Sequence, residues 1–245
     1  MSEYLYGANT AEEVINGGRR KIFRVMAARG KGKGSAAADL ARKKGIRVEF
    51  VDNKVLEKYA PGANHQGIVL EVEPLRHYSA SDALALERDP KRFLWAGVDG
   101  ITDPMNLGAI LRSAACFGVS SVLLPERRTV GITPTVQKTS SGALEKLNIV
   151  PVGNLNSTII DLKERGVWVY GLDMEGEPLD KVDYAFPGLM LIGSEGEGLH
   201  LKTKEHCDRL ISIPQLGGVE SLNASAAAAV AFYEISKALR SARGK

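Results

Sequence analysis

The chain has 245 residues, of which 44% are hydrophobic and 25% charged, and its formal net charge is +3. These values are typical of a globular protein, and no apolar run approaches the eighteen or so residues that span a bilayer, so a membrane-spanning chain is not indicated. The N-terminus contains acidic residues and lacks the basic and apolar regions of a signal peptide. We therefore expect a cytoplasmic protein, or the trimmed, mature form of a mitochondrial one.

The charge is unevenly distributed along the chain. Residues 1–47 hold eleven Lys and Arg against four Asp and Glu, a formal charge of +7, and the rest of the chain carries −4. A basic front part favours a polyanionic partner. The cysteines and histidines have neither disulfide nor metal-ligand spacing, so we expect a reducing compartment and no metal. They are Cys116, Cys207, His65, His77, His200 and His206.

The first seventy or so residues alternate between helical and extended patterns, which predicts a small α/β domain over residues 1–73. Helices are expected at 9–18 and 35–45, and strands at 21–28, 46–51 and 67–73. The loop "ARGKGKGS" at 28–35 spaces basic residues with glycine. We expect this loop to be flexible enough to follow a phosphate backbone and too polar to pack. A solvated surface loop with no binding role is the alternative.

Residues 74–92 have mixed charge with proline near both ends, and they predict a linker with one short helix from Asp82. From residue 93 to 245 short apolar strands alternate with helices, and a long helix is expected from Ser221 to Arg240. This pattern predicts an α/β domain with a parallel sheet covered on both faces.

Three turns that follow predicted strands are more polar than packing requires, and ligands bind where such turns meet. The helix "DPMNLGAILRSAACFG" has Asp103 as a cap and carries Asn106 and Arg112, which its folding does not need. The other two turns are "GSEGEG" at 193–198 and "PQLGGVESLN" at 214–223. Ser221 could simply cap the last helix, but Asn223 in its first turn is harder to explain by capping.

The glycine-rich turn lacks the G-x-G-x-x-G order of dinucleotide sites and the lysine of a P-loop. Its carboxylates, Glu195 and Glu197, would repel phosphates. They suit a nucleoside ligand with a positive centre, such as S-adenosylmethionine. An ordinary strand-to-helix turn is the alternative.

Taken together, the three turns resemble the motifs of the SpoU/TrmH family of RNA ribose 2′-O-methyltransferases in the SPOUT superfamily. The front stretches "YLYG" and "HQGIVLEV" resemble the members that methylate a guanosine of large-subunit ribosomal RNA. The resemblance implies a C-terminal domain with a deep trefoil knot, an S-adenosylmethionine pocket within the knot, and a homodimer. "SLNAS" has Ala224 where many relatives carry valine, which leaves the neighbouring polar residues in place.

The same resemblance assigns roles to individual residues. Cosubstrate contacts fall on Gly193, Ile213 and Leu222, and the catalytic surroundings on Asn106, Arg112, Glu195, Ser221 and Asn223. Arg112 would activate the ribose hydroxyl, either by removing its proton or by stabilising the developing alkoxide and phosphate. The high pKa of an arginine makes the first role chemically difficult.

Three other functions are compatible with parts of the sequence. The same chemistry on transfer RNA is the nearest one, because the motifs report the reaction more than the acceptor. A noncatalytic RNA-binding assembly factor would not need the polar residues of the three turns. A nicotinamide-dependent oxidoreductase would need the dinucleotide fingerprint that is missing.

Overall fold

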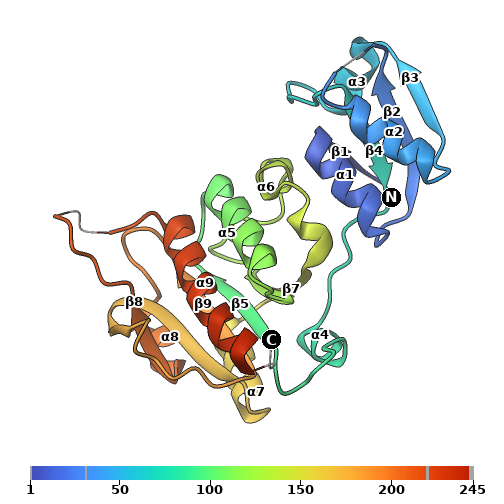
Figure 1. Cartoon of the computed structure of the whole chain (residues 1–245). Coiled ribbons are helices and arrows are strands. Elements are labelled where there is room, and N and C mark those ends of the chain that lie inside the picture. Colours follow the sequence, from blue (N-terminus) through green and yellow to red (C-terminus); the bar gives the residue numbers. More distant parts are fainter. Residues whose placement is uncertain (1, 31, 219–220, 243–245) are drawn as a thin grey trace.

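The computed structural model describes residues 2–30, 32–218 and 221–242, which form two β-sheets with their helices (Figure 1). The front sheet, as we call the first, has the strand order β1-β4-β2-β3. Its elements are β1 (Glu3–Tyr6), α1 (Ala8–Gly17), β2 (Ile22–Ala28), α2 (Ser35–Lys43), β3 (Val48–Val51), α3 (Asn53–Tyr59) and β4 (Ile68–Val72). Of the described helices, none has the length and apolar composition needed to cross a membrane.

Helices cover both faces of the front sheet. Residues of α1 and α2 pack with one set of strand side chains, and Leu56 of α3 packs with Met26 and Val69 on the other face. The expected helices and strands are present. The sequence patterns missed β1 and α3, which have four and seven residues and are too short to show a clear period.

The basic loop after β2 departs from the expectation that it is too polar to pack. Gly34 is buried, and a Cβ atom there would lie 2.9 Å from the backbone oxygen of Gln66. The loop end is therefore pressed against the segment before β4, and this approach needs a glycine. Lys31, in the middle of the loop, lies outside the described residues.

The main sheet has six strands in the order β10-β8-β9-β5-β6-β7, and every pair is parallel. This confirms the predicted parallel sheet. Its strands are β5 (Leu94–Asp99), β6 (Ser121–Pro125), β7 (Asn148–Val152), β8 (Trp168–Pro178), β9 (Gly188–Gly193) and β10 (Arg209–Ser212). Its helices are α4 (Ala80–Ala85), α5 (Pro104–Cys116), α6 (Pro134–Ser140), the short 3₁₀ helix η1 (Ala143–Lys146), α7 (Leu155–Glu164), α8 (Leu201–His206) and α9 (Ala224–Ala242).

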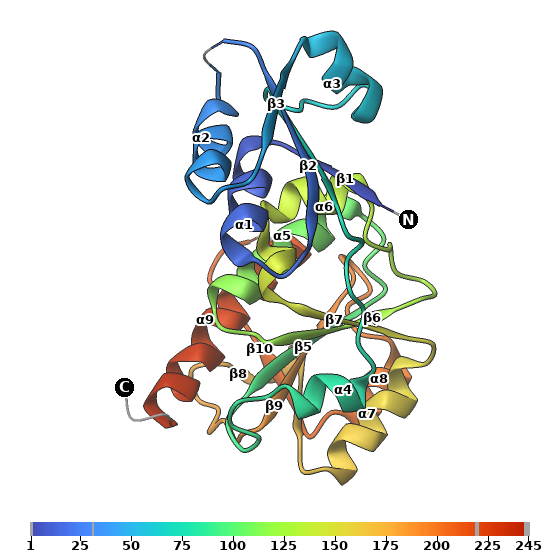
Figure 2. The ribbon, with the colours of Figure 1, turned by 90° about the vertical axis from the view of Figure 1, so that its right-hand side faces the viewer.

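Successive strand residues point to opposite faces of the main sheet, and both faces are covered. In β5, Leu94 and Ala96 pack in the core that holds α5 and α9, whereas Trp95 packs in the core that holds α7. Figure 2 shows the sheet between α5 and α6 on one side and α4 and α7 on the other. The apolar strand runs are thus explained by burial on two sides.

The expected linker is partly ordered by contacts with the main sheet. His77 forms a parallel bridge with Ile149, and α4 begins two residues before the expected Asp82. Its first turn is closed by a capping box. The backbone N–H of Asp82 donates to the side chain of Ser79, and the backbone N–H of Ser79 donates to the side chain of Asp82. Ala83 is buried in the core shared with α7.

The start of the last helix differs from the sequence expectation. α9 begins at Ala224, and Ser221 does not cap it. Instead the side-chain oxygen of Asn223 accepts the backbone N–H groups of Ser225 at 2.9 Å and Ala226 at 3.4 Å. Asn223 is therefore the N-cap, because an asparagine satisfies two free N–H groups of the first turn as well as a serine would.

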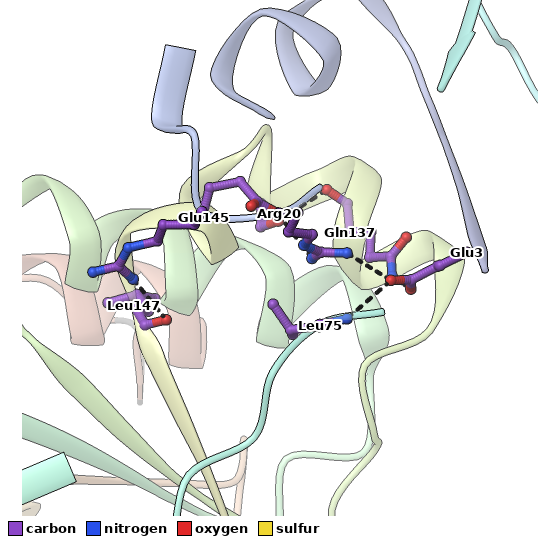
Figure 3. A network of polar contacts seen from close by, with 8 residues as sticks. Glu3, Arg20, Leu75, Gln137, Glu145 and Leu147 are labelled. Carbon is purple, nitrogen blue, oxygen red and sulfur yellow. Dashed lines mark hydrogen bonds and ion pairs between the residues drawn. The ribbon is translucent and has the colours of Figure 1, made fainter. Parts of the chain in front are cut away.

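A buried polar network joins the two sheets with their helices (Figure 3). Arg20, from the front part, pairs with Glu3 at 2.6 Å and with Glu145 of η1 at 2.8 Å. Gln137 of α6 donates to Glu3. The side chains of Arg20 and Glu145 are each 4% exposed, so the two charges are satisfied by one another rather than by water.

Close backbone approach accompanies this network. Gly142 has φ +84°, and a Cβ atom there would lie 2.4 Å from Cβ of Glu13 in α1. Lys146 adds an ion pair to Glu13 at 2.9 Å. The position of α1 against the segment that contains Gly142 and Lys146 is therefore specified by a close contact and by an ion pair.

Candidate active site

The site lies where β9 ends and the glycine-rich turn begins. The turn is closed by two backbone hydrogen bonds between Ser194 and Gly198, of 3.0 and 3.1 Å. A Cβ atom on Gly193 would lie 2.1 Å from the backbone carbon of Gly198. No other residue would allow the chain to fold back on itself so tightly here.

A cavity of about 370 Å³ opens against this turn. All three residues assigned to the cosubstrate, Gly193, Ile213 and Leu222, line it, as do Glu195 and Ser221. These residues come from β9, from the segment after β10 and from the approach to α9. Strands and loops that are distant in the sequence therefore meet at one cavity, as expected for the carboxyl edge of a parallel sheet.

Asn106, Glu195 and Asn223 form a polar cluster beside the cavity. The amide nitrogen of Asn223 donates to the side-chain oxygen of Asn106 at 2.9 Å and to Oε2 of Glu195 at 3.1 Å. The amide nitrogen of Asn106 lies 3.4 Å from the same carboxylate oxygen. One residue from each of the three polar turns is thus held in a single hydrogen-bonded group.

Helix ends fix two members of this cluster. Asp103 accepts the backbone N–H groups of Met105 at 3.2 Å and Asn106 at 2.9 Å, which sets the first turn of α5. Asn223 is itself the cap of α9. Both amides therefore sit at rigid helix starts, and their side-chain nitrogens remain available for Glu195.

Arg112 does not join this cluster within the single chain. It is exposed and donates to the hydroxyl of Ser141 at 3.4 Å, and it does not line the cavity. Arg112 lies six residues beyond Asn106, and at 3.6 residues per turn the two side chains leave α5 in different directions.

The sequence patterns missed one wall of the cavity. Residues 172–175 of β8 line it, including Asp173, which pairs with Lys204 of α8 at 2.5 Å. β8 runs to Pro178, beyond the end of its apolar part, and Gly176 lets Ile211 of β10 approach its backbone. Polar residues directly after an apolar strand run were the available signal.

A contact between Asp99 and His200 fixes the chain after the glycine-rich turn. Asp99 ends β5, and its carboxylate accepts the backbone N–H of His200 at 3.1 Å and contacts Nδ1 of the same residue at 2.8 Å. His200 is the residue before α8. The turn is therefore anchored at both ends, by β9 on one side and by Asp99 on the other.

The electrostatic character of the cavity is acidic. Asp173, Glu175, Glu195 and Glu197 line it together with one cation, Lys204, among the described residues. The remaining wall includes the apolar side chains of Leu172, Met174, Ile192, Ile213 and Leu222. Such a cavity suits a ligand with an apolar or aromatic body and a positive centre. Among the described residues, no group of three or more His, Cys, Asp or Glu side chains is placed so that it could hold a metal ion.

Comparison with known proteins matches both parts of the chain. The profile described as the SpoU rRNA Methylase family matches residues 94–233, and the profile described as RNA 2′-O ribose methyltransferase substrate binding matches residues 4–78. The chain is 37% identical to the 23S rRNA (guanosine-2′-O-)-methyltransferase RlmB of Xylella fastidiosa, over 95% of both chains.

A second curated relative and a solved structure are also similar to this chain. YacO of Bacillus subtilis, whose name gives the TrmH family and both tRNA and rRNA, is 38% identical over 95% of this chain and 94% of its own. The crystal structure of the SpoU methyltransferase AviRb from Streptomyces viridochromogenes superposes with a TM-score of 0.79 at 24% identity, covering 100% of this chain and 92% of that one. This chain therefore belongs to the SpoU rRNA methylase family.

Proposed function

We propose that this protein transfers the methyl group of S-adenosylmethionine to the ribose 2′-hydroxyl of a guanosine in large-subunit ribosomal RNA. The observation that carries the proposal is the meeting of Asn106, Glu195 and Asn223 beside the cavity that Gly193, Ile213 and Leu222 line. The relative from Xylella fastidiosa, alike over nearly its full length, is named for this reaction.

The residues of the cavity fit the cosubstrate. S-adenosylmethionine carries a sulfonium and an ammonium group, which the surrounding carboxylates of Asp173, Glu175 and Glu195 would favour. The tight turn at Gly193 exposes backbone groups at the cavity wall, and Ile213 and Leu222 offer apolar contact. The cosubstrate supplies an activated methyl group with its own leaving group.

The protein's contribution is then orientation and charge. Asn106, Glu195, Ser221 and Asn223 would hold the ribose next to the cavity, and the fixed helix starts keep two of them in place. Arg112 would remove the hydroxyl proton or stabilise the developing alkoxide and phosphate. Since Arg112 lies outside the cavity of its own chain, we assign it to the cavity of a second chain.

A homodimer therefore forms part of the proposal. Val230 and Tyr233 of α9 are 41% and 49% exposed, and a second chain that packs on this helix would cover them. If each active site takes residues from two chains, an inactive Arg112→Ala protein mixed and refolded with an inactive Asn106→Ala protein will recover part of the activity. No recovery, together with a monomeric mass in solution, would contradict the shared site.

Residues 1–73 are proposed as the RNA substrate-binding domain, 74–92 as the linker and 93–245 as the methyltransferase domain. The charge of +7 on residues 1–47 and the substrate-binding profile over residues 4–78 support this division. We place the reaction in the cytoplasm, where bacterial ribosomal RNA is found, with a mature mitochondrial form as the alternative.

Transfer of a labelled methyl group tests the function. The purified protein is incubated with labelled S-adenosylmethionine and, separately, with unmodified ribosomal RNA and transfer RNA. We expect a 2′-O-methylguanosine in large-subunit ribosomal RNA. Label in transfer RNA alone would favour the transfer RNA enzyme, and cosubstrate binding by calorimetry with no transfer to either RNA would favour a noncatalytic assembly factor.

A further inference from the structure

A second cavity, of about 480 Å³, lies at the far end of the front sheet. The parallel strands β2 and β3 both end there, and the antiparallel β4 begins there. Three segments therefore meet at this edge, namely the loop after β2, the start of α3 and residues 63–67. The carboxyl ends of parallel strands are the usual place for ligands in such folds.

Backbone hydrogen bonds between the segments around this cavity hold its walls in place. Ala28 donates its N–H to the oxygen of Gly67 at 2.8 Å, and Gly34 donates to the oxygen of Gln66 at 2.9 Å. Gln66 adopts φ 55°, which non-glycine residues seldom do, and its side-chain oxygen accepts the N–H of Ala8 at 2.9 Å. The strained residue is held by contacts from both directions, which indicates a shaped wall.

The charged side chains that line the cavity are cations, and the nearby carboxylate of Glu57 lies 3.8 Å from Nε2 of His65. Arg29 and Lys33 line it, both exposed, and no carboxylate lines it among the described residues. Neither of these two side chains makes a hydrogen bond or ion pair with any part of the chain that the structure describes, although the backbone N–H of Arg29 donates to the oxygen of Val51 at 3.1 Å. This contrasts with the acidic cavity at Glu195, and an anionic ligand would gain two charge-assisted contacts here.

The other lining groups suit a base rather than a bare phosphate. Asn53 and Asn64 are exposed at the rim and offer both donors and acceptors. His65 is half-buried, and its Nδ1 accepts the N–H of Gly67 at 3.1 Å, which fixes the ring plane. The volume lies in the range of small-molecule sites and has room for one nucleotide.

We propose that this cavity binds one unpaired nucleotide of the RNA substrate, with its phosphate at Arg29 and Lys33 and its base at Asn53, Asn64 and His65. The inference rests on the proposed RNA-methylating function and names the place in residues 1–73 where the RNA is gripped. A nucleotide that is splayed out of its stack can present its base edge to side-chain amides, which a paired one cannot.

Binding of a fluorescein-labelled single-stranded RNA dodecamer, followed by anisotropy, tests the phosphate contacts. The double variant Arg29→Ala with Lys33→Ala should weaken binding about tenfold or more, and should reduce the salt slope by about 1.4, since each single-strand phosphate contact contributes about 0.7. The matched control, Lys43→Ala with Lys58→Ala, removes the same charge from exposed positions outside the cavity. Equal weakening in the control would overturn the site, because general charge would then explain the binding.

A second variant tests the base contacts without changing charge. Asn53→Ala with Asn64→Ala should weaken binding about tenfold and leave the salt slope unchanged. GMP should compete with the dodecamer, and inorganic phosphate at the same ionic strength should not. An unaffected amide variant, or equal competition by phosphate, would overturn a nucleotide site. Photo-crosslinks from 4-thiouridine in the dodecamer should map to Asn53 or residues 63–67, and crosslinks found only elsewhere would contradict it.

Failure of this inference can be told apart from failure of the proposed function. Cosubstrate binding by calorimetry should be the same in all these variants, because the second cavity shares no residue with the first. If the unaltered protein methylates ribosomal RNA but its cavity variants bind the dodecamer like the control, only the nucleotide site is wrong. If the variants behave as expected and no RNA is methylated, the proposed function is wrong.

Discussion

Asn223 donates its side-chain amide to the side-chain oxygen of Asn106 over 2.9 Å, although 117 positions separate the two residues. The same amide reaches Glu195, and the oxygen of Asn223 caps α9. A single asparagine thus caps the start of α9 and joins three polar turns, so its structural and chemical roles can be separated by substitution.

Asn223→Ala removes both roles, whereas Asn223→Asp keeps the capping oxygen and removes the amide donors. We expect the alanine variant to lose about 1 kcal/mol of unfolding free energy and the aspartate variant to remain close to the unaltered protein. Both should lose methyl transfer, roughly 10²-fold, because the cluster with Glu195 is no longer held. An aspartate variant with full activity would show that the amide donors are dispensable. Urea unfolding and the transfer assay measure the two effects.

Gly193→Ala would place a methyl group 2.1 Å from the backbone of Gly198. The turn must open to accept it, so we expect the dissociation constant for S-adenosylmethionine to rise at least about tenfold, equal to about 1.4 kcal/mol. Gly217→Ala is the control, since open space surrounds that position. Calorimetry measures both dissociation constants. Equal affinities of the two variants for S-adenosylmethionine would show that the turn at Gly193 is not part of the cosubstrate site.

Arg112→Ala should fold normally, since Arg112 is exposed in its own chain. It should also still bind the cosubstrate, since the role proposed for Arg112 is toward the ribose hydroxyl and phosphate of the RNA. Methyl transfer should fall by about 10²-fold or more if the guanidinium group serves the developing charge. Arg127→Ala, at another exposed position, controls for the loss of one positive charge. Normal transfer by the Arg112 variant would defeat both roles proposed for this residue.

Arg20→Met should destabilise the protein by about 3–5 kcal/mol, because it leaves the carboxylates of Glu3 and Glu145 without their buried partner. The control is Arg24→Met. Arg24 also pairs with a glutamate, Glu49, but both side chains are about one-third exposed, so the loss there should be clearly smaller. Thermal and urea unfolding of the two variants test the difference. Equal losses of unfolding free energy would contradict a stabilising role of the Arg20 network between the front sheet and the main sheet.

The unfolding free energy should also depend on pH through Glu145. Burial raises the pKa of this carboxyl above its usual 4.5, and the nearby Arg20 only partly opposes the shift. The folded protein then holds this proton to higher pH than the unfolded chain, so the contribution is largest below pH 4.5 and is lost as pH rises through the raised value. Urea unfolding from pH 4 to 8 should show the stability advantage over Glu145→Gln shrinking as pH rises. A constant difference would contradict the raised pKa.

Local sequence patterns were sufficient for most of the architecture. Asp103 and Pro104 mark the start of α5, and continuous apolar runs mark the strands of the main sheet, because capping and two-sided burial leave short-range signals. The three polar turns were also found, since a strand followed by glycine and polar residues is visible along the chain. The expected knot stays a prediction, because the order of strands gives their neighbours and not the threading of the chain.

Contacts between distant residues decided the rest. Only the tertiary structure shows that Asn223 and not Ser221 caps α9, that Asp173 and Lys204 build a cavity wall, and that Arg112 does not line its own chain's cavity. The sequence by itself predicted the candidate residues for the chemistry and most of the strands, because these predictions depend on residue type and period. The tertiary structure decided which of them meet, because hydrogen bonds, ion pairs and close glycine contacts depend on positions in space that no short stretch encodes.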